Sequence, residues 1–221
     1  MFKEVKLITK LHQSTKRNYL QRMNDNKIKC MKVAKKFESQ YWDGKRRFGY
    51  GGYKYIPGRF ENMAKNLIKK YKLKSNSRVL DIGCGKGYLM YEIKKIIPEI
   101  KVYGLDISRY AIKASKKNFK NNFFVHDASK KLPFKKNYFD LTLSINVLHN
   151  LKINDFEKAI KEINRVSRKS FIVLESYNNE KELFNLQCWA LTCQSFFSKD
   201  EWKWLFKRFK YSGDFEFIFF R

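Results

Sequence analysis

The chain has 221 residues, of which 43% are hydrophobic and 17% aromatic, so it can bury a sizeable core, and a wholly disordered chain is excluded. Its formal net charge is +27, but the 37 Lys and 11 Arg are scattered along the sequence. Scattered lysines favour a solvated surface over a dedicated nucleic-acid or membrane site.

The first 57 residues predict a helical segment and a loop in front of the main domain. Apolar residues from Cys30 to Phe37 recur at helical spacing. The stretch from Tyr41 to Arg59 contains four glycines before Pro57, which predicts a shaped loop rather than a regular helix. We place the boundary at residue 57, so that residues 58–221 form the second unit.

This loop has two interpretations, a lid over a binding pocket or a structural wrap, and we favour the lid. Its arginines, which can hold a carboxylate or phosphate through two parallel hydrogen bonds, are Arg46, Arg47 and Arg59. Its tyrosines, which could orient an acceptor molecule, are Tyr50, Tyr53 and Tyr55.

Strand and helix patterns alternate through the rest of the chain. Strands are predicted at 77–82, 101–106, 123–126, 140–145, 171–175 and 215–220. Helices are predicted between them, with Ser108 as one N-cap, a capping box at Asn154 and Glu157, and a last helix at 199–209. This order predicts an α/β fold with a doubly wound, mostly parallel sheet and helices on both faces.

A glycine-rich turn follows the first strand, in the sequence VLDIGCGKGYLMYEI. The strand ends at Asp81, and Gly83, Gly85 and Gly87 lead into a helix. Such glycines allow a tight turn and let a ligand lie against the backbone beside a helix N-terminus. The third glycine of the dinucleotide spacing GxGxxG is replaced by Tyr88, and the spacing DxGxGxG is typical of S-adenosylmethionine sites.

Acidic residues end the next two strands. A carboxylate at Asp106 can accept both ribose hydroxyls of a nucleoside, and Asp127 can accept from the adenine amino group while the backbone of Ala128 contacts the ring edge. Cys84 and Ile107, which neighbour these positions, complete this part of the predicted cofactor site.

With these motifs, residues 60–175 resemble a class I, Rossmann-like S-adenosylmethionine-dependent methyltransferase of the small-molecule methyltransferase-domain type. The resemblance implies a six- or seven-stranded sheet whose last strand is antiparallel; for a sixth strand, only residues 210–214 are available. It implies S-adenosylmethionine as cofactor, S-adenosylhomocysteine as product and no metal. The whole-chain pattern is also similar to bacterial methyltransferases of surface-polysaccharide or secondary-metabolite pathways.

The fourth strand, FDLTLSINVLHNL, has the position that borders cofactor and acceptor in this family. The resemblance places Ser144 and Asn146 near the methionine part of the cofactor. The catalytic candidates are His149 as a general base, Glu175 at the end of the fifth strand, and Tyr53; Asn150 and Tyr177 are further pocket candidates. The alternative for His149, which we favour, is that it caps or packs the following turn. For Glu175 and Tyr177, a loop carboxylate and a packed ring remain open as alternatives.

Four cysteines without a CxxC pair and three histidines predict no structural zinc site. For Cys188 and Cys193 we favour core packing. The N-terminus lacks the apolar run of a signal peptide and no apolar stretch is long enough to span a bilayer, so we expect a cytoplasmic protein.

We expect methyl transfer to oxygen or nitrogen of a small polar acceptor. An RNA or protein methyltransferase that uses the lysine-rich surface and a non-catalytic cofactor-binding partner subunit are the alternatives. Nucleic acid is disfavoured because no NPPY-like tetrapeptide follows the fourth strand and no RNA-binding module is recognisable. The oligomeric state is left open.

Overall fold

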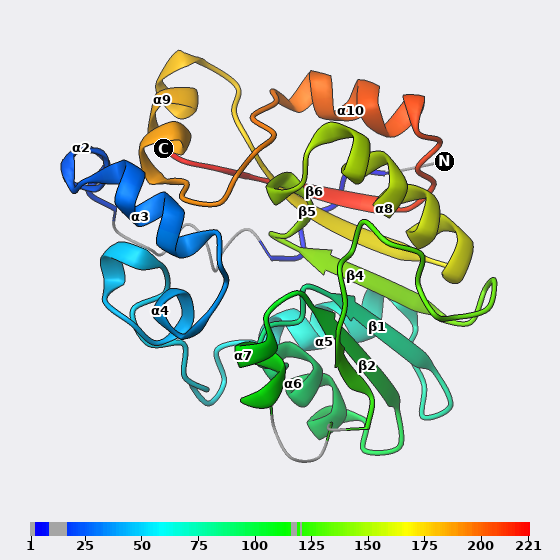
Figure 1. Cartoon of the computed structure of the whole chain (residues 1–221). Helices are drawn as coiled ribbons and strands as arrows, with labels where there is room; N and C mark the ends of the chain where they lie inside the picture. The colour runs from blue at the N-terminus through cyan, green and yellow to red at the C-terminus, as the bar shows by residue number, and fades with distance from the viewer. Residues whose placement is uncertain (1–2, 9–16, 116–118, 120) are drawn as a thin grey trace.

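Six parallel strands form the central sheet of the molecule (Figure 1). The computed structural model describes residues 3–8, 17–115, 119 and 121–221. The strands are β1 (Arg78–Ile82), β2 (Lys101–Asp106), β3 (Phe123–Val125), β4 (Leu141–Ile145), β5 (Ser170–Ser176) and β6 (Asp214–Phe219), in the order β3-β2-β1-β4-β5-β6. The chain order reverses between β1 and β4, so the ends of these strands form the crevice in which doubly wound folds bind ligands.

Helices cover both faces of the sheet, as predicted. The helices of the main body are α5 (Glu61–Tyr71), α6 (Tyr88–Ile96), α7 (Arg109–Lys113), α8 (Ile153–Val166), α9 (Glu180–Trp189) and α10 (Lys199–Arg208). Residues of α5, α6 and α9 share one hydrophobic cluster with the sheet, and residues of α8 and α10 share a second one. Because side chains alternate along a strand, Val79 joins the first cluster while Leu80 and Ile82 join the second.

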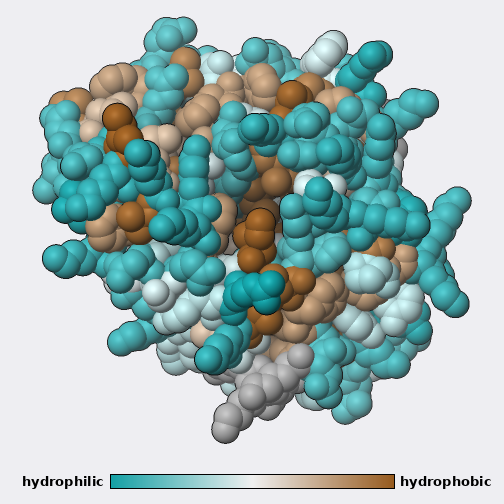
Figure 2. All heavy atoms as spheres, viewed as in Figure 1, coloured by the Kyte–Doolittle hydropathy of each residue, from teal (hydrophilic) through white to brown (hydrophobic). Residues whose placement is uncertain are grey.

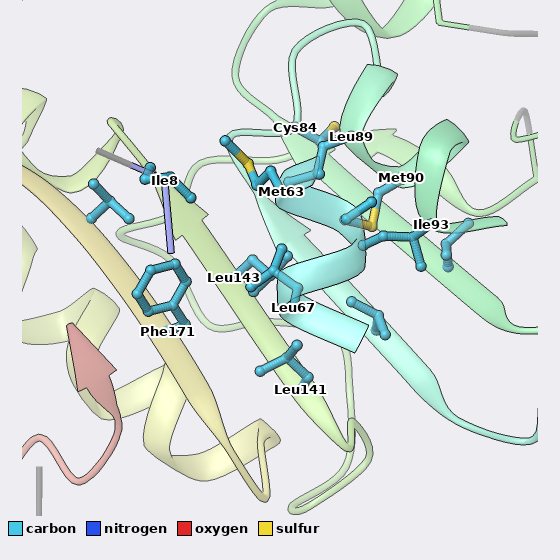
Figure 3. Close-up of a cluster of buried hydrophobic side chains, with 14 of the residues drawn as sticks. Ile8, Met63, Leu67, Cys84, Leu89, Met90, Ile93, Leu141, Leu143 and Phe171 are labelled. Carbon is cyan, nitrogen blue, oxygen red and sulfur yellow. The ribbon is translucent and has the colours of Figure 1, made fainter. Parts of the chain in front are cut away.

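Figure 3 shows the first cluster, in which α5 and α6 pack on the strands through Met63, Leu67, Met90, Ile93, Leu141, Leu143 and Phe171. Full burial of one such aliphatic side chain contributes about 1.5–3 kcal/mol. This packing fixes the N-terminus of α6, and with it the glycine-rich turn that precedes the helix.

The last strand runs parallel to its neighbour, which corrects the antiparallel strand that the family resemblance implied. β6 pairs with β5 from Phe171↔Asp214 to Ser176↔Phe219. The chain reaches β6 by crossing over through α10, and such a crossover returns it in the same direction as β5. Residues 210–214, the only ones available for an additional strand, form none: Lys210 has φ 56° and Asp214 already begins β6.

Two local predictions are also wrong. The helix predicted from Cys30 to Phe37 ends at Ala34, and Phe37 lies beyond it with φ 52°. α8 begins at Ile153 after Lys152, which provides no side-chain cap, so Asn154 lies inside the helix. The Ser108 cap is confirmed, because its side chain accepts a hydrogen bond from Ala111 N.

The N-terminal segment lies at the carboxyl ends of the strands. It contains α2 (Tyr19–Asn24), α3 (Lys27–Ala34), α4 (Ser39–Trp42) and the 3-10 turn η1 (Arg46–Phe48). In Figure 1 these elements gather beside α9, toward the arrowhead of β4. Lys27 Nζ ties the segment to the body by donating to Cys188 O at 2.6 Å. The division at residue 57 stays a prediction.

Candidate functional site

The glycine-rich turn adopts a backbone that only small residues tolerate well. Gly83 and Gly85 have φ 78° and 55°, in the left-handed region. A Cβ on Gly83 would lie 2.1 Å from Val147 Cγ2, and one on Gly85 would lie 2.9 Å from the Trp42 ring. Val147 and Trp42 therefore pack closely on the turn, and both glycines also line the cavity described below.

Gly83→Ala should destabilise the fold by about 2–5 kcal/mol, because the left-handed backbone costs about 1–2 kcal/mol and overpacking about 1–3 kcal/mol. Urea unfolding measures the change. Gly52→Ala is the matched control, since Gly52 also has a positive φ of 104° but has nothing within 4 Å of the added Cβ. Equal losses in both variants would contradict the close packing at Gly83.

Asp106 joins the turn to the end of β2. Its Oδ2 accepts from Gly85 N and its Oδ1 from Ser108 N, each at 2.8 Å. A carboxylate has about four acceptor positions, so each oxygen keeps one for a ligand. Burial raises the pKa of Asp106, although the two backbone N–H groups oppose this effect.

The other predicted adenosine contacts lie next to Asp106. Ile107 is 53% exposed, so its side chain is available to pack on a flat ring. Asp127 is partly exposed, and its Oδ1 accepts from Ser129 N at 2.8 Å. Ala128 is partly buried at the same edge.

A cavity of about 450 Å³ extends from the glycine-rich turn toward α9. Of the predicted cofactor residues, it is lined by Asp81, Gly83, Cys84, Gly85, Asn146 and Arg59. Asn146 has φ 58°, in the left-handed region that asparagine adopts more readily than most residues. Burial is the larger cause and repulsion from Asp106 the smaller cause that together raise the pKa of Asp81 to about 7.

In Figure 2, mainly hydrophilic side chains cover the molecule, with a hollow near the middle of the view where hydrophobic side chains are exposed.

His149 and Glu175 form a pair on the wall of this cavity. Glu175 N donates to His149 Nδ1 at 3.4 Å, which assigns the ring proton to Nε2, and Nε2 lies 3.5 Å from Glu175 Oε2. Burial lowers the pKa of His149 to about 3, so the ring is neutral. Burial raises the pKa of Glu175 to about 7, with Arg17 opposing the shift.

The loop after α4 closes over the glycine-rich turn. Trp42 Nε1 donates to Ser108 Oγ at 2.9 Å, and the ring stacks on Tyr50. Lys86, which is buried, forms an ion pair with Asp43 at 2.7 Å. Burial opposes ionisation of Asp43, but hydrogen bonds from Lys86, Tyr110 and the Tyr53 amide together lower its pKa.

Asp43→Asn should loosen this loop, because it weakens the charge-assisted bonds from Lys86. We expect hydrogen–deuterium exchange in residues 41–53 to become about tenfold faster or more, the factor that corresponds to a loss of about 1.5 kcal/mol. Asp155→Asn, which breaks only an exposed pair with Lys158, is the control. Unchanged exchange in Asp43→Asn would contradict this role of the ion pair.

The structure brings most predicted residues together, but not all. Tyr53, Tyr50 and Asn150 line the cavity. Ser144 is fully buried and donates to Ile82 O at 3.3 Å, and Gly87 is buried as the N-cap of α6. Arg47 pairs with Asp25 outside the cavity, Tyr55 donates to Glu92, and Tyr177 donates to Glu201.

Sequence reasoning missed Arg17, Arg22 and Trp189, which also line the cavity. They come from the N-terminal segment and from α9. No spacing rule connects residues so far apart in the sequence.

The described residues contain no group of three or more side chains that could hold a metal ion. His12 lies outside them. Over the described part of the chain, no helix is long and apolar enough to cross a membrane. The four cysteines are buried free thiols.

Two family models match the chain. Residues 73–210 match the family described as "Methyltransferase domain", and residues 6–130 match protein-L-isoaspartate (D-aspartate) O-methyltransferase. A ubiquinone biosynthesis O-methyltransferase of Pelagibacter ubique is 28% identical over 160 residues, which are 68% of this chain and 65% of that protein. A demethylmenaquinone methyltransferase of Staphylococcus saprophyticus is 29% identical over 64% of this chain and 66% of its own length. The matches thus span slightly less than two thirds of either relative.

Solved structures share the fold. YcgJ of Bacillus subtilis has a TM-score of 0.52 at 21% identity, with 66% of each chain covered. The geranyl diphosphate C-methyltransferase of Streptomyces coelicolor, solved with Mg²⁺, geranyl diphosphate and S-adenosylhomocysteine, has a TM-score of 0.53 at 12% identity over 66% of this chain and 58% of its own. The predicted class I fold is confirmed.

Proposed function

Since the chain belongs to the methyltransferase-domain family, whose match covers residues 73–210, we propose that it moves a methyl group from S-adenosylmethionine to oxygen or nitrogen of a small polar acceptor. The observation that carries this proposal is the juxtaposition of the glycine-rich turn, the Asp106 carboxylate bound to its backbone, and the cavity that begins at Asp81. A volume of about 450 Å³ lies within the range of roughly 300–1,000 Å³ typical of small-molecule sites.

The residues of the site fit the two ends of the cofactor. Asp106 has acceptor positions left for the ribose hydroxyls, and Ile107 offers an exposed apolar side chain for the adenine ring. Asp81 can bind the amino group of the methionine end, and Arg59 its carboxylate. Trp42 and the aromatic loop cover the turn, which keeps water from the reacting groups.

The cofactor supplies an electrophilic methyl group on a sulfonium sulfur. The residues of the cavity would position an acceptor so that its nucleophile could displace the sulfur leaving group in line. Positioning of this kind can lower the activation free energy of the reaction by about 7–11 kcal/mol.

Glu175 is the proposed general base for a hydroxyl acceptor. It faces the cavity, and its pKa of about 7 suits proton transfer near neutral pH. His149 is a positioning residue, because its Nδ1 accepts from the Glu175 amide and its Nε2 faces the carboxylate. Tyr53, whose pKa burial raises well above the usual value, stays protonated and can donate to the acceptor.

Transfer of radiolabel from methyl-labelled S-adenosylmethionine into fractions of a cell extract tests the proposal. We expect label in small molecules. Label only in RNA or protein would contradict the small-molecule acceptor, and a cofactor that binds without any transfer would favour a non-catalytic subunit.

A further inference from the structure

Within the part of the chain that the structure describes, three arginines lie around one indole ring in the wall of the cavity. The guanidinium carbons of Arg17, Arg22 and Arg46 lie 5.4, 5.1 and 5.2 Å from the centre of the Trp189 ring. Arg17 precedes α2, Arg22 lies in α2, Arg46 begins η1 and Trp189 ends α9, so separate segments converge here. Cation–π contact accounts for attraction to the ring but not for three like charges on one ring.

Two members of this cluster, Arg22 and Arg46, lack a nearby carboxylate. Among the described residues, no carboxylate lies within 4 Å of the guanidinium of Arg22 or Arg46, and Arg22 Nε is buried without a hydrogen-bond partner. The remaining residues of the chain, 1–2, 9–16, 116–118 and 120, include no Asp or Glu. Burial and the neighbouring Arg46 lower the pKa of Arg22. Two neighbouring guanidinium groups without a carboxylate partner favour the binding of an anion between them.

The cluster also has a defined place relative to the proposed chemistry. It lines the same cavity as Glu175 and Asp81, and the charge of Arg17 acts on Glu175. Arg59 lines the cavity too but does not share the Trp189 ring. A molecule bound at the cluster can therefore present its far end to the base.

We propose that the methyl acceptor carries an oxyanion, a phosphate or a carboxylate, which binds Arg17, Arg22 and Arg46 beside Trp189 and so places the acceptor's nucleophile next to Glu175. This inference rests on the proposed function. Guanidinium groups bind such oxyanions through two parallel hydrogen bonds, which fix both position and orientation. Arg59 is left for the carboxylate of the cofactor.

Calorimetry on protein saturated with S-adenosylhomocysteine tests the inference, with inorganic phosphate and malonate as probes at constant ionic strength. We expect one saturable site for at least one probe. Affinity should fall at least tenfold in Arg22→Gln/Arg46→Gln, which removes charge-assisted bonds. Arg46 is exposed, so we expect the single variant Arg46→Gln to fold. If the double variant does not fold, the affinity of Arg46→Gln is measured in its place.

Arg47→Gln is the matched control, because Arg47 adjoins Arg46 but pairs with Asp25 outside the cavity. The inference is overturned if the cofactor product binds and neither probe does, or if Arg47→Gln loses as much affinity as Arg46→Gln. It is also overturned if the probes bind only without S-adenosylhomocysteine, since the arginines would then serve the cofactor's carboxylate. Failure of S-adenosylhomocysteine to bind at all would instead contradict the proposed function.

Discussion

Asp106→Asn is expected to weaken the binding of S-adenosylhomocysteine by about 10- to 150-fold, the range that corresponds to loss of about 1.5–3 kcal/mol for a hydrogen bond to a charged group. The substitution removes the charge that we propose accepts hydrogen bonds from the ribose hydroxyls. It also removes one of the two oxygens that accept from Gly85 N and Ser108 N, so the turn loses part of its support. Isothermal titration calorimetry measures the dissociation constant.

Asp200→Asn is the control for this experiment, because Asp200 is an exposed aspartate in the first turn of α10 and, unlike Asp106, accepts no hydrogen bond from the glycine-rich turn. The Asp200→Asn variant should bind S-adenosylhomocysteine with the affinity of the wild type. Comparable affinities in all three proteins would place the ribose elsewhere and remove Asp106 from the site.

Glu175→Gln should lower kcat/KM by about 10²- to 10⁴-fold for a hydroxyl acceptor, the usual contribution of a general base. In the wild type, kcat/KM should rise with pH and level off above about 7, because burial raises the pKa of Glu175 to about 7 and only the ionised carboxylate accepts a proton. The variant should lose this rise. The acceptor identified by the radiolabel experiment serves as substrate.

Two further variants separate the base from its neighbour. Glu180→Gln changes an exposed glutamate at the start of α9 and should leave the profile unchanged. His149→Asn removes the group that faces Glu175 Oε2, so it should shift the midpoint of the profile rather than abolish the rise. If Glu175→Gln kept the wild-type profile, the base would have to be another group.

The cofactor side of the site could be predicted because its residues are close in sequence and obey strand geometry. Parallel strands end at the same edge of a sheet, so Asp81 and Asp106 had to meet around the glycines between them. The direction of β6 was not predictable in this way. The family resemblance implied an antiparallel strand, whereas the crossover through α10 makes it parallel.

The acceptor side could be predicted only in part. The sequence indicated a loop with arginines and tyrosines, and the structure places Arg46, Tyr50 and Tyr53 at the cavity while Arg47 turns outward to Asp25. Adjacent residues in a loop point in different directions, and sequence alone does not fix which one faces inward. Trp189 comes from α9, more than 140 residues away, so its contact with Arg46 depends on tertiary packing.

Titration of the wild-type chain with S-adenosylhomocysteine in a calorimeter tests the central claim most directly. The account predicts a single saturable site per chain, with affinity that Asp106→Asn weakens and Asp200→Asn does not. Absence of saturable binding to the folded wild-type chain, with S-adenosylmethionine as well as with its demethylated product, would contradict it.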